Sequence, residues 1–235
     1  MGEGGGVKED GTLGVSSSEP RPREPRALLG VVMAGGRSRR FGGDKALFPL
    51  AGRPMAGWPL MALSPWTVFQ GVIANAPEVG EALGVPWRSD HYPDAGPLGG
   101  LHAALSWAEE EGLSGVLALA CDLPLVSSDL LGRLVRAWPE EATVVVPESP
   151  GPLGFEPLCA GYRRRALPQV QGLLETGGRS MREALERLDV HRIPLPSLGT
   201  PREVELAFTN VNEPKVADRA REILEERFPM GPGTP

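Results

Sequence analysis

The sequence predicts an α/β fold, a three-layer α/β/α sandwich around a mostly parallel, Rossmann-like sheet. Short apolar runs alternate with longer segments whose apolar residues recur every three to four positions, which favours alternating strands and helices. The runs are near-continuously apolar, which is typical of parallel strands buried on both faces. In such sheets ligands bind outside the carboxyl ends of the strands, so we expect the chemistry in the loops after Met33, Ala74 and Cys121.

Four strands are expected from these apolar runs. The first is Leu28–Met33, a short run followed by glycines, and the last is rich in β-branched residues. The four predicted strands are Leu28–Met33 and residues 68–74, 115–121 and 143–146.

Four helices are expected from their periodicity. The first places Leu101, Ala104, Leu105 and Ala108 on one face. For the last helix, Asn212 is the expected N-cap, and Pro214 falls in the first turn. The predicted helices are residues 101–111, 130–138, 180–188 and 216–228.

Gly and Pro, with 31 and 25 residues among 235, approach the level that is typical of low-complexity disorder. Hydrophobic residues nevertheless make up 41%, which suffices for a sizeable core. Residues 1–26 contain hardly any apolar side chains, so we expect a disordered tail there, and a second one at 229–235. The sequence therefore predicts a single domain over residues 27–228.

Charge and hydropathy exclude several classes of function. The chain carries 24 basic and 30 acidic residues, a net charge of -6, which disfavours a nucleic-acid partner. No apolar run approaches the roughly 20 residues of a membrane helix, and residues 1–27 lack the apolar core of a signal peptide. We therefore expect a cytoplasmic protein with no membrane partner.

Some residue types are scarce, which draws attention to the positions that keep them. There are three lysines, at 8, 45 and 215, and three asparagines, at 75, 210 and 212. This composition suits a GC-rich genome and equally a thermophile. The two cysteines, Cys121 and Cys159, lie in apolar stretches and are expected to be buried small side chains.

The loop after the first strand is rich in glycine and basic residues. It reads Met33-Ala-Gly-Gly-Arg-Ser-Arg-Arg-Phe-Gly-Gly-Asp-Lys45 and has neither the Walker A nor the G-x-G-x-x-G spacing. Adjacent glycines let backbone N–H groups approach a phosphate chain closely. Arg40 and Lys45 can neutralise charge on that chain, although a solvated basic loop remains the alternative.

This loop resembles the signature of the nucleotidyltransferases that share the nucleotide-diphospho-sugar-transferase fold. It is most similar to that of the molybdenum cofactor guanylyltransferase (MobA) family, Leu-Ala-Gly-Gly-x-Ser-x-Arg-Met-Gly-x-Asp-Lys. The order and spacing match, with Met33 for the Leu and Phe41 for the Met. Five further segments resemble family motifs in the same order: residues 72–77, Asp90 with 96–100, 120–124, 156–162 and 208–214.

The resemblance implies transfer of GMP from GTP to the terminal phosphate of molybdopterin, with release of pyrophosphate. It implies Mg²⁺, or Mn²⁺ in its place, on Asp122, because such an ion offsets the repulsion between two anionic substrates. Arg40, Lys45 and Asp122 are the implied catalytic residues. The residues implied for GTP binding are Met33, Ala34, Gly35, Gly36, Lys45, Asn75, Asp90 and Asp122.

Molybdopterin binding is implied for Asn210 and Asn212, and the loops 151–155 and 176–179 are candidates for the same pocket. Other roles stay open for several residues. Asp122 also suits a helix N-cap or a turn before Pro124, and Asp90 suits an exposed loop position. The three histidines, His91, His102 and His191, show no metal-ligand spacing and receive no role.

The choice of base rests on the loop. Cytidylyltransferases for the same cofactor typically have Ala-Ala-Gly and end in Pro-Lys, whereas this chain has Ala34-Gly-Gly and Asp44-Lys45. The alternatives are a CTP-dependent molybdopterin cytidylyltransferase, a guanylyltransferase for another phosphorylated acceptor, and a non-catalytic nucleotide-binding regulatory module. Handing over an oxygen-sensitive cofactor suggests transient contacts with other proteins of cofactor biosynthesis.

Overall fold

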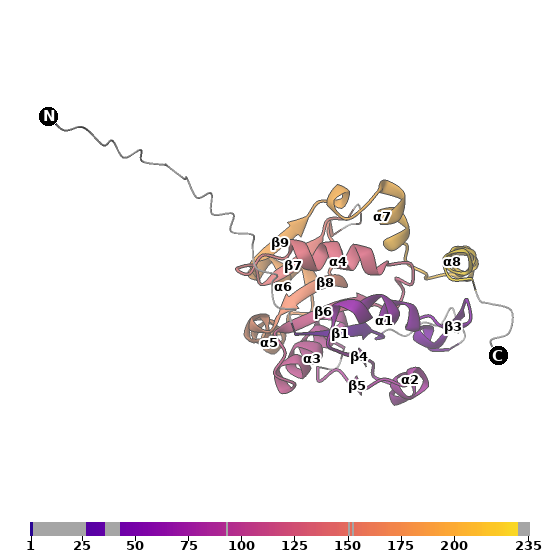
Figure 1. Ribbon diagram of the computed structural model, residues 1–235. Coiled ribbons are helices and arrows are strands. Elements are labelled where there is room, and N and C mark those ends of the chain that lie inside the picture. Colours follow the sequence, from indigo (N-terminus) through magenta and orange to yellow (C-terminus); the bar gives the residue numbers. More distant parts are fainter. Residues whose placement is uncertain (2–26, 36–42, 93, 150, 152, 230–235) are drawn as a thin grey trace.

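The computed structural model describes Met1 and residues 27–35, 43–92, 94–149, 151 and 153–229. Both predicted tails therefore fall almost entirely outside the described residues. Within the described part, the centre of the molecule is a seven-stranded sheet with helices on both faces (Figure 1). The predicted three-layer α/β/α fold is confirmed.

The strand order is β5-β4-β1-β6-β8-β7-β9, and every strand runs parallel to the others except β8. A short antiparallel pair, β2 with β3, stands apart from this sheet. The strands are β1 Leu28–Met33, β2 Pro49–Leu50, β3 Arg53–Pro54, β4 Phe69–Ile73, β5 Trp87–Arg88, β6 Gly115–Ala120, β7 Val144–Pro147, β8 Cys159–Arg163 and β9 Val190–Ile193.

Two groups of helices cover the two faces of the sheet. Helices α3, α5 and α6 bury their apolar residues on one face, and α1, α2, α4 and α7 do so on the other. The α-helices are α1 Gly57–Leu63, α2 Pro77–Leu83, α3 Gly96–Glu110, α4 Ser128–Ala137, α5 Leu167–Glu175, α6 Met181–Arg187, α7 Pro201–Ala207 and α8 Pro214–Arg227; single 3-10 turns are η2 Lys45–Leu47, η3 Ser64–Trp66, η4 Arg164–Ala166 and η5 Leu195–Ser197.

The alternation of side chains along each strand explains why both faces need helices. In β1, Leu29 and Val31 join the core under α3, while Leu28 and Val32 join the core under α1 and α4. Because every residue of β1 is buried, the strand reads as continuously apolar in sequence.

A third, smaller core joins α8 to the β2–β3 pair. Leu50, Met55 and Trp58 pack there against Val211 and the buried stripe of α8. In Figure 1 this helix lies to the right, apart from the layers that cover the sheet. The chain therefore returns, after α7, to the neighbourhood of the loop that follows β1.

Most predicted elements are confirmed within a few residues, but two details are wrong. The helix predicted at 101–111 begins at Gly96, because Pro97 lacks an N–H and suits the first helical turn. Asn212 is not the N-cap of α8: that position is Glu213, and no side chain caps it. Pro214 does lie in the first turn. None of the helices in the described residues is long and apolar enough to cross a membrane.

Candidate active site

The loops that follow β1, β4 and β6 meet at one edge of the sheet, as expected. Hydrogen bonds prolong the strands slightly: Ala34 N–H donates to the Ile73 carbonyl (2.9 Å), and Cys121 N–H donates to the Met33 carbonyl (3.1 Å). Beyond these bonds the chain leaves the sheet at Gly35 and Asp122. This edge is where a doubly wound sheet binds its ligands.

Lys45 is the centre of the site. Its ammonium nitrogen lies 2.8 Å from Asp122 Oδ2 and also donates to Asn212 Oδ1. The residue is only 8% exposed. A cation so buried needs acceptors and an opposite charge, and these two side chains supply both.

The backbone fixes this arrangement from both sides. Asp44 accepts the Ala46 N–H (2.9 Å) and so caps the short turn that carries Lys45. On the other side, Val211 N–H donates to the Asp122 carbonyl at 2.9 Å. The segments around Lys45 and Val211, far apart in sequence, thus meet at Asp122. Asn210 precedes Val211 in the chain and is exposed.

Asn75 and Asp90 form a second polar group along the same edge. The Asn75 side-chain oxygen accepts the backbone N–H of Asp90 (3.1 Å), and Asp90 Oδ1 accepts the Tyr92 N–H (2.7 Å). The carboxylate lies against Gly99 in the first turn of α3, where a Cβ would come within 2.3 Å of Asp90 Oδ2. Because Gly99 has no side chain, the Asp90 carboxylate can occupy this space.

The remaining residues predicted to bind GTP differ in their exposure to solvent. Met33 and Ala34 are buried, whereas Gly35 is exposed. The side chain of Met33 packs on Gly100, where a Cβ would come within 2.5 Å of its methyl carbon. Gly36 and Arg40 lie outside the described residues.

One carboxyl at this edge was not selected from the sequence. Glu156, in the loop between β7 and β8, is half-buried and accepts a hydrogen bond from Ser149 Oγ at 2.5 Å. Burial raises the pKa of Glu156 above its ordinary value; the bond from Ser149 opposes this, and the nearby charge of Asp122 adds to it. Only its position before the Pro-Leu segment could have marked it in the sequence.

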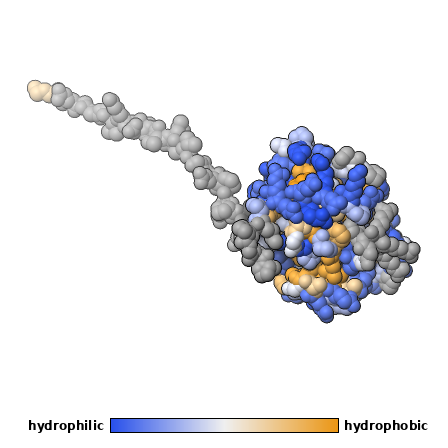
Figure 2. Space-filling view, turned by 90° about the vertical axis from the view of Figure 1, so that its right-hand side faces the viewer, coloured by the Kyte–Doolittle hydropathy of each residue, from blue (hydrophilic) through white to orange (hydrophobic). Residues whose placement is uncertain are grey.

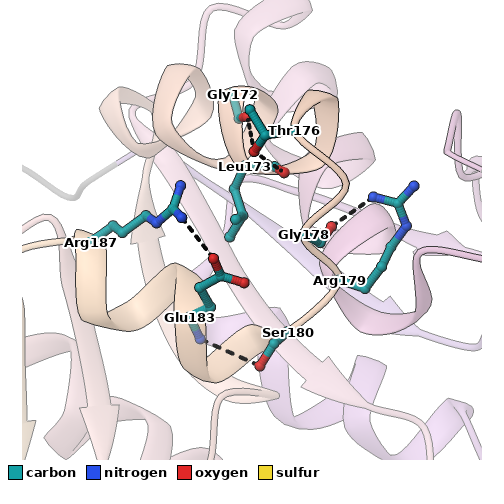
Figure 3. A network of polar contacts seen from close by, with 8 residues as sticks. All are labelled: Gly172, Leu173, Thr176, Gly178, Arg179, Ser180, Glu183 and Arg187. Atoms are coloured by element: carbon teal, nitrogen blue, oxygen red, sulfur yellow. Dashed lines mark hydrogen bonds and ion pairs between the residues drawn. The ribbon is translucent and has the colours of Figure 1, made fainter.

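The turn at 176–179, also expected near the acceptor, uses its polar groups internally (Figure 3). Thr176 Oγ1 donates to the Gly172 and Leu173 carbonyls at the end of α5, at 3.0 and 2.9 Å. Arg179 donates to the Leu174 carbonyl (3.0 Å) and to the Gly178 carbonyl (2.7 Å). These bonds hold the corner between α5 and α6.

Three further titratable side chains, one histidine and two cysteines, are buried in the same part of the fold. His102 in α3 is 7% exposed, and its Nδ1 has no hydrogen-bond partner among the described residues. Burial lowers the pKa of His102, and the neighbouring His91 adds to this. Cys121 and Cys159 are buried, as predicted. Burial raises the pKa of Cys121 to about 12, and that of Cys159 is raised as well, so both thiols stay protonated.

The donor set fits a divalent cation brought in with phosphates. Asp122 offers carboxylate oxygens on a side chain that is 21% exposed, and Mg²⁺ prefers one or two carboxylates beside phosphate oxygens. Among the described residues, no three His, Cys, Asp or Glu side chains gather into a metal site of their own.

Figure 2, turned to the side on which α8 lies, shows a hydrophobic strip through a mainly hydrophilic face.

Comparison with known proteins agrees with this geometry. Residues 30–191 match the family model described as a MobA-like NTP transferase domain. A probable molybdenum cofactor guanylyltransferase from Nostoc sp. is 36% identical over 196 residues, which cover 80% of this chain and 87% of that protein. A molybdenum cofactor guanylyltransferase from Rhodobacter capsulatus is 30% identical over 204 residues, covering 86% and 99% of the two chains.

Solved structures extend the likeness to the fold. The molybdopterin-guanine dinucleotide biosynthesis protein A of Archaeoglobus fulgidus superposes with a TM-score of 0.68 at 26% identity, covering 85% of this chain and all of that one. The 2-C-methyl-D-erythritol 4-phosphate cytidylyltransferase of Thermus thermophilus has the same fold, with a TM-score of 0.57 at 17% identity over 83% and 98% of the two chains. The chain belongs to the family of MobA-like NTP transferases and is a nucleotidyltransferase.

Proposed function

We propose that this protein transfers GMP from GTP to the phosphate of molybdopterin and releases pyrophosphate. The observation that carries the proposal is the buried Lys45–Asp122 pair at the carboxyl edge of the sheet, with Asn212 on the same ammonium. Relatives that are named molybdenum cofactor guanylyltransferases match over most of the chain and support the choice of substrates.

The reaction joins two anions, so charge is the main obstacle. An oxygen of the acceptor phosphate attacks the α-phosphorus of GTP, the bond from that phosphorus to the bridging oxygen breaks, and pyrophosphate leaves with the electron pair. The nucleophile is the acceptor phosphate itself, so the protein positions groups and neutralises charge.

Lys45 and Arg40 would stabilise the triphosphate and the departing pyrophosphate. Asp122 would hold Mg²⁺, or Mn²⁺, which offsets the charge on the phosphate oxygens when it is bound. Once the nucleotide is present, the Lys45 ammonium can exchange its bond to Asp122 for phosphate oxygens. The buried position of Lys45 keeps that charge close to the reacting centre.

We assign the nucleotide to the side of β1, β4 and β5. The backbone of Met33, Ala34, Gly35 and Gly36 would face the phosphates, while Asn75 and Asp90 would contact the base and ribose. Asn210 and Asn212, on the segment bonded to Asp122, would face molybdopterin. We also propose that residues 27–228 act as one domain in the cytoplasm, with transient contacts to other proteins of cofactor biosynthesis.

The test is a turnover assay with purified protein, Mg²⁺ and molybdopterin, in which GTP, CTP, ATP and UTP are supplied separately. We expect GTP to yield the guanine dinucleotide, which is identified by its mass. The Asp122→Asn variant is the matched control and should be inactive. Product from CTP instead of GTP would replace the guanylyl assignment with the cytidylyl one. GTP binding without any dinucleotide would favour the non-catalytic regulatory module.

A further inference from the structure

The strand order divides the carboxyl edge of the sheet into two regions, one for each substrate that the proposed function requires. Asp122 follows β6, and the nucleotide residues Asn75 and Asp90 follow β4 and β5 on one side of it. On the other side of β6 stand β8 and β7, whose connecting loop carries Glu156. If the nucleotide lies over β1, β4 and β5, the acceptor is left with the edge beyond β6.

The pairing of β6 with β8 brings the loop that carries Glu156 to the edge where Asp122 lies, and the charge of Asp122 acts on Glu156. Leu119 pairs with Cys159, and Ala120 N–H donates to the Leu158 carbonyl at 2.8 Å. Asp122 follows the end of β6 by two residues, and Glu156 precedes the start of β8 by three, so both lie just beyond the paired residues at the same edge. The chain turns at this point, because Cys159 N–H bonds to the Glu156 carbonyl (3.1 Å), so Glu156 stands at the rim of the ladder.

The loop holds one oxygen of Glu156 and leaves the other available. Ser149 Oγ donates to Oε1 at 2.5 Å, and Gly151 N–H donates to the same Ser149 oxygen at 3.0 Å. Glu156 N–H bonds to the Pro147 carbonyl (3.0 Å), which fixes the backbone. Within the described residues no hydrogen bond to Oε2 is present, so this oxygen is the one that a ligand can use.

The sign of the charge decides which part of the acceptor this oxygen can meet. A carboxylate next to Asp122 repels a phosphate, but it accepts hydrogen bonds from N–H and O–H groups. The acceptor phosphate must approach Asp122, and the pterin attached to it carries several N–H donors. In the turn at 176–179, Thr176 Oγ1 and Arg179 Nη1 donate within the corner between α5 and α6.

We propose that Glu156 is a residue that binds and selects the acceptor: Oε2 accepts a hydrogen bond from an N–H group of the pterin and thereby places the acceptor phosphate beside Asp122. Ser149 positions the carboxyl by holding Oε1. This inference rests on the proposed function, because it takes molybdopterin as the acceptor.

The test compares two variants that each remove one negative charge from the same loop. In Glu156→Gln, with Ser149 still donating to the amide oxygen, an NH₂ group faces the pterin donors, so the dissociation constant for molybdopterin should rise about tenfold. Glu148→Gln alters an exposed neighbour and should leave the constant unchanged. Molybdopterin binding is measured anaerobically by equilibrium dialysis, without turnover, and GTP binding is measured by calorimetry.

Support requires that acceptor affinity falls while GTP affinity stays within about twofold. Glu156→Asp, which keeps the carboxylate, should recover part of the affinity. Equal acceptor affinity in Glu156→Gln and the unaltered protein would overturn the role of Glu156 while leaving the proposed function intact. A joint loss of GTP and acceptor binding would overturn it too, because damage to the fold would then explain the result. An unaltered protein that binds GTP but not molybdopterin would overturn both proposals.

Discussion

Two carboxylates, Asp90 and Glu156, lie on opposite sides of Asp122 at the same edge of the sheet, in contrasting surroundings. Asp90 belongs to a parallel β–α unit, so its carboxylate lies against the first turn of α3 and accepts the Tyr92 N–H. Glu156 precedes β8, the one antiparallel strand in the described sheet, and the helix that follows β8 begins at the far edge.

The surroundings of Glu156 have an electrostatic consequence. Burial raises the pKa of Glu156, and the nearby charge of Asp122 adds to this. On the proposed nucleotide side Asp90 accepts a backbone N–H, whereas on the other side Glu156 accepts the Ser149 hydroxyl.

The largest expected effect comes from the residue between the two sides. Asp122→Ala removes the carboxylate that pairs with Lys45 and that is proposed to hold the cation, so kcat should fall by a factor of about 10³ or more. Turnover is measured at saturating GTP and molybdopterin, and excess Mg²⁺ should not restore it. Full activity in this variant would remove Asp122 from its central role and with it the division into two sides.

The second prediction disturbs only the nucleotide side. Gly99→Ala puts a Cβ within 2.3 Å of Asp90 Oδ2, which must move, so the dissociation constant for GTP should rise about tenfold. Calorimetry with GTP measures it. Gly172→Ala is the matched control, because a Cβ there meets open space and should leave GTP binding unchanged. Unchanged GTP affinity in Gly99→Ala would mean that Asp90 does not contact the nucleotide.

The third prediction tests the electrostatics of the other side through stability. The raised pKa of Glu156 means that the folded protein keeps this proton at pH values where the unfolded chain, with a Glu pKa of about 4.3, has lost it. Stability is therefore lost as the pH rises through the pKa of the folded protein. Glu156→Gln should raise Tm by about 1–3 °C near pH 8 and have little effect near pH 4. An equal effect on Tm at both pH values would show that ionisation of Glu156 does not destabilise the folded protein.

The smallest effect concerns the strands beneath the two sides. Cys121 follows β6 and Cys159 begins β8, and both thiols are buried with raised pKa values. A thiol reagent at about pH 8 should therefore label neither cysteine in the folded protein and both in denaturant. Rapid labelling of Cys159 alone would indicate that the antiparallel side opens more readily than the β6 side.

The sequence predicted the parallel half of the molecule better than the rest. Strands β1 and β6 are continuous apolar runs, and Asp122 follows β6, so pattern and motif agree there. Strands β5 and β9 have four residues or fewer, which gives periodicity little to act on. The reversal of β8 depends on tertiary pairing, and it is this reversal that brings the loop of Glu156 to the edge where Asp122 lies.

The role of Asn212 shows the same limit at the level of one residue. An Asn two positions before a Pro is typical of a helix N-cap, so local chemistry predicted a cap. In the structure the side chain instead serves Lys45, 167 positions earlier in the chain. The gain from satisfying a buried ammonium exceeds that of capping an exposed helix end, and no local pattern encodes a contact over such a separation.

The contact between Lys45 and Asn212 also sets the order in which the site can be completed. A ribosome releases the chain from its N-terminal end, so Lys45 and Asp122 emerge long before the segment that carries Val211 and Asn212. Until that segment arrives, the lysine lacks one of its two partners, and the loop that must close is among the longest in the molecule. A nascent chain that ends before residue 211 thus carries the sheet and both charged residues, but it cannot yet assemble the centre that unites them.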